Sequence, residues 1–125
     1  MEEHPNATKY REVTEAFNAG NVEQMADYVA DDVEWWYIGG DQPMRGKQAL
    51  MEFYGQLSGD VDIKVDLHDV VANDEHLIAL VNATATRGGR TLNYKTAEIH
   101  HVKDGKITHR WAFSDDTEAI NKFFA

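Results

Sequence analysis

Apolar residues at helical spacing predict two helices in the first third of the chain. Tyr10 and Phe17 lie on one face of a helix over residues 6–19, which small residues end. Asn21 offers its side-chain oxygen to the free amide groups of a second helix over residues 22–30. The pattern therefore predicts a helical beginning to the chain.

Three consecutive aromatic residues follow these helices. Trp35, Trp36 and Tyr37 are predicted to lie on one strand, where alternation turns Trp35 and Tyr37 to one face and Trp36 to the other. Glycine and proline break this strand into a loop that runs from Gly39 to Arg45-Gly46. Apolar residues at helical spacing over residues 50–57 then predict a third helix.

The second half of the chain changes to a period of two, which is typical of strands with one buried face. Residues 61–67 alternate apolar and polar side chains, and later strands are predicted over residues 76–87, 91–103 and 106–115. The last residues, 117–125, return to helical spacing. Helices followed by antiparallel strands favour an α+β fold, in which one strongly curved, mostly antiparallel sheet wraps around three N-terminal helices.

The dipeptide Gly88-Gly89 is a two-residue turn, and a turn of known length fixes which residues lie opposite each other. Pairing outward from it sets Ala83 against Tyr94 and Ala79 against Glu98. Small apolar residues therefore surround the Glu98 carboxylate.

A second turn, at Asp104-Gly105, decides which face of the last strand is buried. As a two-residue loop it sets Glu98 opposite Trp111. One face of the sheet then collects aromatic and polar side chains over an apolar floor, which is the usual chemistry of a small-molecule site. The predicted members of this face are Tyr94, Glu98, His100, His109, Trp111, Phe113 and Asp115.

A three-residue loop at the same turn would give the opposite result. A slip of one residue would bring Arg110, Ala112 and Ser114 to the buried face instead. We prefer the two-residue loop because it buries Trp111 and Phe113 rather than Arg110.

Glu98 is the principal candidate for chemistry. A carboxylate among apolar walls is desolvated, which predicts a raised pKa and a role as a general acid or base, unless Glu98 only hydrogen-bonds inside the fold. Asp115 is predicted to act as a second acid or, alternatively, to cap the C-terminal helix. Tyr37 is predicted to donate a hydrogen bond to a substrate oxygen and Trp35 to form a flat wall, with ordinary core packing as the alternative for both.

Composition narrows the classes of partner. Of the 125 residues 42% are hydrophobic, which is enough for one core, so we expect a single domain over residues 1–125. Twelve Lys and Arg against 22 Asp and Glu give a net charge of −10, which disfavours nucleic acid. No apolar run approaches the roughly 18 residues of a membrane span, so we expect a soluble protein. The absence of cysteine suits a reducing compartment, and we expect a cytoplasmic location.

Three stretches of the chain resemble the SnoaL-like polyketide cyclases, ketosteroid isomerases and limonene epoxide hydrolases of the NTF2-like superfamily. The stretches are "AFNAGNVEQMADYVADDVEW", "MRGKQALMEFY" and "EIHHVKDGKITHRWAFSDD", which match the order of two helices, first strand, third helix and final hairpin. The resemblance covers nearly the whole chain. It implies a cone-shaped barrel around the helices, an internal pocket without a cofactor, and a homodimer formed through the sheet.

The resemblance also assigns positions to catalytic residues of these families. The carboxylate base on the first strand of the isomerases falls on Tyr37 and their helix-one tyrosine on Val13, while their buried acid has a counterpart in Glu98. The acid that the cyclase and epoxide hydrolase patterns imply at the end of the last strand is Asp115. The arginine that the hydrolases place between two acids falls on Thr96, so both the isomerase and the hydrolase mechanisms are disfavoured.

Two functions therefore stay open. The first is acid–base chemistry, as isomerisation, cyclisation or hydration, on an apolar or aromatic small molecule, with Glu98 as the main acid or base. The second is a non-catalytic ligand-binding or dimerisation module. His100 and His109 with Glu98 would make a metal site of the facial-triad type, but the resemblance implies a pocket without cofactors, and we expect neither a metal nor a cofactor.

Overall fold

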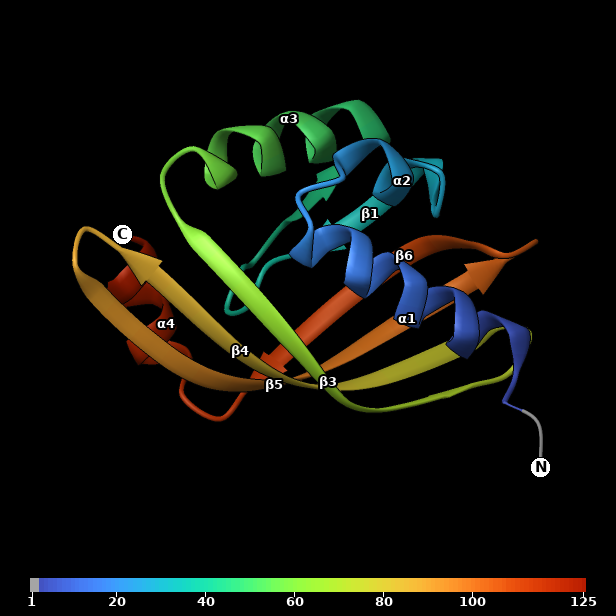
Figure 1. Cartoon of the computed structure of the whole chain (residues 1–125). Helices are drawn as coiled ribbons and strands as arrows, with labels where there is room; N and C mark the ends of the chain where they lie inside the picture. The colour runs from blue at the N-terminus through green and yellow to red at the C-terminus, as the bar shows by residue number, and fades with distance from the viewer. Residues whose placement is uncertain (1–2) are drawn as a thin grey trace.

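A computed structural model describes residues 3–125, in which a strongly curved sheet of six strands wraps around the N-terminal helices (Figure 1). This confirms the α+β prediction. The helices are α1 (Pro5–Asn18), α2 (Val22–Ala26), α3 (Lys47–Ser58) and α4 (Thr117–Phe124). The strands are β1 (Val29–Trp36), β2 (Pro43–Arg45), β3 (Asp62–Ala72), β4 (His76–Arg87), β5 (Arg90–Lys103) and β6 (Lys106–Ser114), and they lie in the order β2-β1-β6-β5-β4-β3.

The structure corrects the predicted elements in the first half of the chain. Helix α2 ends at Ala26 rather than at residue 30, because Tyr28 and Val29 are buried in the core and β1 begins at Val29. The segment predicted as a loop contains β2, which pairs antiparallel with β1. Strand β1 also pairs in parallel with β6, so that the sheet is mixed. A membrane span would require a longer apolar helix than any that occurs within residues 3–125.

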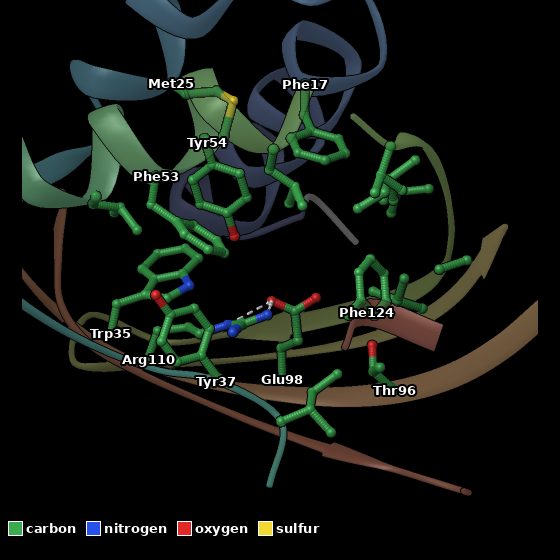
Figure 2. Close-up of a pocket in the computed structure, with 18 of the residues that line it drawn as sticks. Phe17, Met25, Trp35, Tyr37, Phe53, Tyr54, Thr96, Glu98, Arg110 and Phe124 are labelled. Atoms are coloured by element: carbon green, nitrogen blue, oxygen red, sulfur yellow. Dashed lines mark hydrogen bonds and ion pairs between the residues drawn. The ribbon is translucent and has the colours of Figure 1, made fainter. Parts of the chain in front are cut away.

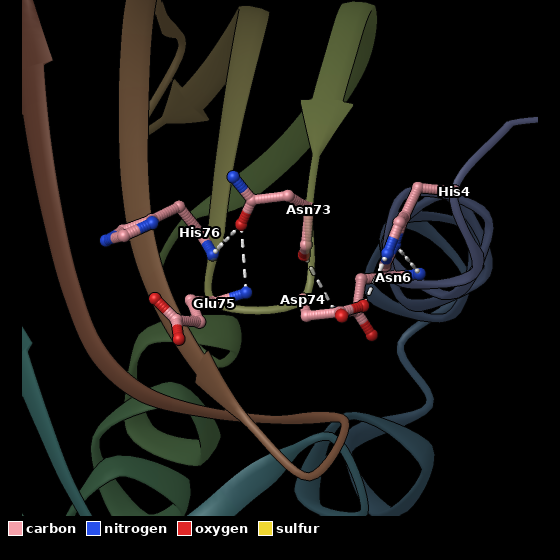
Figure 3. Close-up of polar contacts among 6 residues, drawn as sticks. All are labelled: His4, Asn6, Asn73, Asp74, Glu75 and His76. Carbon is pink, nitrogen blue, oxygen red and sulfur yellow. Dashed lines mark hydrogen bonds and ion pairs between the residues drawn. The ribbon is translucent and has the colours of Figure 1, made fainter.

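The start of α1 is tied to the turn between β3 and β4 (Figure 3). Pro5 occupies the first helical turn, where its missing amide proton costs nothing, and the His4 ring accepts a hydrogen bond from the Asn6 amide. His4 Nε2 also lies 2.9 Å from Asp74 Oδ1, and Asn6 Nδ2 donates to the Asn73 carbonyl at 3.1 Å. These contacts hold α1 against the concave side of the sheet.

The turn at Gly88-Gly89 has the predicted geometry. Both glycines have positive φ, 55° and 80°, as a tight hairpin turn between twisted strands requires. The pairs Ala83–Tyr94 and Ala79–Glu98 are Cα partners in β4 and β5. The predicted register of this hairpin is confirmed.

The turn at Asp104-Gly105 also has two residues, but the register predicted from it is wrong beyond the first pairs. Val102 still faces Ile107, whereas the next pair is His101 with His109, so β6 carries one extra residue, a β-bulge at Thr108. Every later residue of β6 is therefore shifted by one and faces the opposite side of the sheet.

As a result, the faces of β6 are those of the alternative that we set aside. Arg110 and Ala112 are buried on the concave face, while His109, Trp111 and Phe113 lie on the convex face. Phe113 is 58% exposed. The burial of Trp111 and Phe113 that favoured the other register does not occur.

Candidate active site

An aromatic cavity of about 480 Å³ lies between the concave face of the sheet and the helices (Figure 2). Helices α1, α3 and α4 supply part of its wall, and the small side chains of Val81 and Ala83 on β4 leave space at its floor. Its size and apolar lining suit a small organic molecule. The aromatic residues that line it are Tyr10, Phe17, Tyr28, Trp35, Tyr37, Phe53, Tyr54, Tyr94 and Phe124.

A buried ion pair between Glu98 of β5 and Arg110 of β6 lies in this apolar space. Both Nε and Nη2 of Arg110 lie 3.1 Å from Glu98 Oε1. The guanidinium is held from two further directions, because Nη1 donates to the Trp36 carbonyl at 2.9 Å and Cζ lies 4.7 Å from the Trp35 ring centroid. Only 12% of the Glu98 side chain and 11% of the Arg110 side chain are exposed.

The two oxygens of Glu98 have different surroundings. Besides Arg110, Oε1 accepts a hydrogen bond from the Tyr10 hydroxyl at 3.4 Å, and His100 Nε2 lies 3.5 Å away without hydrogen-bond geometry. Within residues 3–125, Oε2 has no such partner, and Figure 2 shows it pointing away from Arg110 into the cavity. One oxygen is therefore used by the fold and the other is free for a ligand.

The pKa of Glu98 is shifted in the direction opposite to our prediction. Burial alone would raise this pKa, but the charge of Arg110 and the neighbouring His100 outweigh burial and lower the pKa to about 2. The prediction of a raised pKa is wrong because it assumed a carboxylate without a cation beside it. Glu98 is ionised at neutral pH.

Four of the predicted site residues line the cavity: Glu98, Trp35, Tyr37 and Tyr94. His100 lies on the same face of the sheet but is fully buried behind the cavity wall, where its ring packs edge-on against Tyr10 with centroids 5.0 Å apart. Burial lowers the pKa of His100, which favours a neutral imidazole in the core.

The other predicted residues lie elsewhere. His109, Trp111 and Phe113 are on the convex face, where the His109 and Trp111 rings stack with centroids 5.7 Å apart. Asp115 is exposed, and its Oδ1 accepts a hydrogen bond from the Lys95 amide at 3.1 Å. The cap of α4 is the neighbouring Asp116. In the part of the chain that the structure describes, no group of three His, Asp or Glu side chains is placed to hold a metal ion.

The polar residues of the cavity that were not predicted as site residues include Arg110, Tyr10 and Tyr54. Arg110 appeared only in the alternative register, because burying a lone cation is unfavourable and its partner was not considered. Tyr10 and Tyr54 served only as residues at helical spacing that predict two of the helices. Burial raises the pKa of both tyrosines, so each hydroxyl keeps its proton.

The fold has an aromatic cavity inside a cone of sheet and helices, with one buried acid on the penultimate strand. This arrangement is typical of the class of proteins that bind a small molecule in an internal pocket. The chain belongs to the SnoaL-like domain family, whose model matches residues 10–110. It is similar to an uncharacterized protein of Mycobacterium tuberculosis, with 29% identity in an alignment of 117 residues, and the match covers 88% of each chain.

Solved structures share this fold. Bal32a, from a soil-derived mobile gene cassette, is 22% identical over 96% of both chains with a TM-score of 0.85. TerC, co-crystallized with polyporic acid, is 17% identical over 95% of this chain and 97% of its own, with a TM-score of 0.83. Sequence identities of 17% and 22% establish that the fold is shared and nothing more.

Proposed function

We propose that the protein binds a flat, apolar small molecule in the aromatic cavity and contacts it through Oε2 of Glu98. The observation that carries this proposal is the asymmetry of the carboxylate: Arg110 holds Oε1, and Oε2 faces an apolar space of about 480 Å³. The aromatic walls offer ring stacking, and a charged acceptor in a desolvated site forms strong hydrogen bonds. The fold neighbour TerC, crystallized with polyporic acid, supports an organic ligand.

In a reaction, the ionised Glu98 could only accept a proton from the bound molecule, and the low pKa that Arg110 gives it makes it a weak base. The cation of Arg110 keeps the carboxylate charged, and the Tyr10 hydroxyl donates to the same oxygen. The chemistry is acid–base catalysis of an isomerisation, cyclisation or hydration without a cofactor. The alternative is binding without turnover.

A ligand screen on three proteins tests this proposal. Aromatic and polycyclic compounds are added to the wild type, to Glu98→Gln and to Glu34→Gln, and the melting temperature is measured. We expect compounds that carry a hydrogen-bond donor to stabilise the wild type and Glu34→Gln, but not Glu98→Gln, by mass action. Equal binding by Glu98→Gln would show that Glu98 is not the contact.

Turnover is followed separately by NMR of each binding compound incubated with the enzyme. Conversion by the wild type that Glu98→Gln abolishes supports the catalytic function. Binding without any conversion leaves the non-catalytic alternative.

We also infer that two copies of the chain associate through the convex face of the sheet. One row of uncharged side chains crosses four adjacent strands there, namely Val71, Ile78, Ile99 and Trp111. The neighbouring row, Leu80, Ala97 and Phe113, has a charge only at its end on β3, in Asp69. A patch of this kind on a protein with a net charge of −10 favours self-association, because its centre brings no like charges together. The large apolar side chains exposed on this face are Val71, Ile78, Leu80 and Phe113.

Sedimentation measures this association directly. The wild type is expected to have twice the 14.2 kDa mass of one chain, and Phe113→Lys to be monomeric. Thr84→Lys, which adds the same charge farther along the convex face, is the control and should remain dimeric. A monomeric wild type overturns this inference and leaves the cavity proposal intact.

A further inference from the structure

The hydroxyl group of Tyr54 lies in the cavity with its ring held on three sides. Tyr54 is near the middle of α3, and its ring packs edge-on against Trp35, Phe17 and Phe53, with centroid distances of 6.1, 6.0 and 5.4 Å. Figure 2 shows the hydroxyl pointing from the helix toward the Glu98–Arg110 pair on the sheet. Among the described residues, the structure records no hydrogen bond from this hydroxyl. Its direction is fixed by packing, and its proton is free for a ligand.

Tyr37, the tyrosine predicted to orient a substrate oxygen, is arranged differently. Its hydroxyl lies 3.9 Å from the sulfur of Met44, to which it donates, and in Figure 2 its oxygen points away from Glu98. Both tyrosines line the cavity, but only Tyr54 directs its hydroxyl toward the ion pair. The two residues therefore form a natural pair for comparison.

The donor of Tyr54 and the acceptor of Glu98 face the cavity from opposite layers of the fold. Burial raises the pKa of Tyr54, so its hydroxyl donates at neutral pH, while the carboxylate oxygen only accepts. A ligand hydroxyl group accepts and donates at once, and so it satisfies both. Because Arg110 balances the charge of Glu98, a cationic ligand gains little net attraction, and an anionic ligand meets the carboxylate.

We propose that Tyr54 and Glu98 together form a subsite for a ligand hydroxyl group, and that the ligands of this cavity are neutral hydroxylated ring compounds, such as phenols or cyclic alcohols. This inference rests on the proposed binding function of the cavity. It names the side chain on α3 that acts with Glu98, and the chemical group that the two recognise.

Two probes of equal shape isolate the hydroxyl group: 2-naphthol and 2-methylnaphthalene. Their Kd values are measured by equilibrium dialysis with the wild type, Tyr54→Phe and the matched control Tyr37→Phe. We expect the wild type and Tyr37→Phe to prefer 2-naphthol by roughly tenfold, which is the usual gain from hydrogen bonding to a charged acceptor. Tyr54→Phe should reduce this preference to about threefold or less. The affinity of 2-methylnaphthalene should not change, because it contacts only the apolar walls.

Each outcome separates the two proposals. If the wild type binds neither probe, the binding function of the cavity fails. If it binds both probes equally, or if Tyr54→Phe keeps the tenfold preference, the hydroxyl subsite is wrong while the cavity remains a binding site. A third probe, 2-naphthylmethylammonium, overturns the neutral ligand class if it binds more tightly than 2-naphthol.

Discussion

The sheet carries a glutamate, an arginine and a histidine together on each of its two faces, at similar distances. On the concave face the arginine lies 3.1 Å and the histidine 3.5 Å from the glutamate, and on the convex face these distances are 3.1 and 3.0 Å. The concave group is almost closed to water, whereas the glutamate and arginine of the convex group are 33% and 73% exposed. The concave group is Glu98, Arg110 and His100, and the convex group is Glu34, Arg45 and His109.

Burial, rather than the choice of residues, therefore decides what such a group contributes to stability. Water screens the convex pair, so each partner is replaceable at small cost. The concave pair is shielded from water, so each side chain stays charged only because its oppositely charged partner lies beside it. Substitutions on the two faces, and a change of pH, test this contrast.

Removing the arginine should separate the two faces most clearly. Arg110→Met leaves the Glu98 carboxylate buried without a cation, and we expect the free energy of unfolding to fall by about 3 to 5 kcal/mol. Arg45→Met on the convex face should cost less than about 1 kcal/mol. Urea unfolding followed by circular dichroism measures both. A cost below 1 kcal/mol for Arg110→Met would mean that water reaches the concave pair.

Acid should destabilise the protein through Glu98. Its folded-state pKa of about 2 lies below its ordinary value of 4.5, so its contribution is complete above about pH 5 and is lost as the pH falls from 4.5 toward 2. The loss is on the order of 3 kcal/mol. Glu98→Gln does not titrate and should have a shallower profile of unfolding free energy between pH 5 and pH 2.

The matched variant for the acid profile is Glu34→Gln. Because water screens the convex group, this substitution should cost less unfolding free energy at neutral pH than Glu98→Gln does, and it controls for the loss of one carboxylate. Profiles for Glu98→Gln and the wild type that run parallel through this range would contradict the role of the buried carboxylate.

The smallest contrast concerns two threonine hydroxyl groups. Thr96 faces the concave side, is 8% exposed, and within residues 3–125 its hydroxyl has no hydrogen-bond partner. Thr96→Val keeps the shape and removes this uncompensated group, so we expect a gain of about 1 kcal/mol. On the convex face Thr84 donates to Asn93 Oδ1 at 2.8 Å, and Thr84→Val should lose about 0.5 kcal/mol. Thermal unfolding gives both signs, and a destabilised Thr96→Val would reveal a partner for its hydroxyl.

The residues of one turn made it possible to predict, from the sequence, which residues of β4 and β5 pair with each other. Gly88 and Gly89 tolerate the positive φ of the turn, and the pairs that follow are then fixed by counting, including Ala79 with Glu98. The carboxylate of the candidate site was placed correctly by this argument. Its pKa was not, because that depends on Arg110, which comes from another strand.

The last strand could not be read in the same way. The turn at Asp104-Gly105 was predicted with the right length, but the bulge at Thr108 leaves no mark in the turn. Hydrophobicity then favoured Trp111 and Phe113 as buried residues over Arg110. The preference was wrong because an arginine can be buried when a buried glutamate lies beside it. Whether Arg110 can be buried therefore depends on its partner, which the hydrophobicity of one position does not reveal.

The sequence pattern also could not predict which strands pair when they lie far apart along the chain. Strand β2 has only three residues, Pro43–Arg45, which is too few to show an alternation. The parallel contact of β1 with β6 joins residues such as Trp35 and Arg110 that lie far apart along the chain. The position of the Tyr54 hydroxyl in the cavity could not be predicted for a different reason. Apolar residues at helical spacing do not distinguish a ring that packs in the core from a ring that lines a cavity.

The single extra residue at Thr108 gives this fold an unusual sensitivity to length. Substitutions along β6 can alter the chemistry of the cavity one side chain at a time. A deletion of one residue at the bulge would exchange the two faces of β6 in a single step. Trp111 and Phe113 would then lie on the concave face and Arg110 on the convex face. In this chain, a change in length by one codon would therefore replace Arg110 by aromatic rings on the cavity side of β6 and leave Glu98 of β5 without its cation.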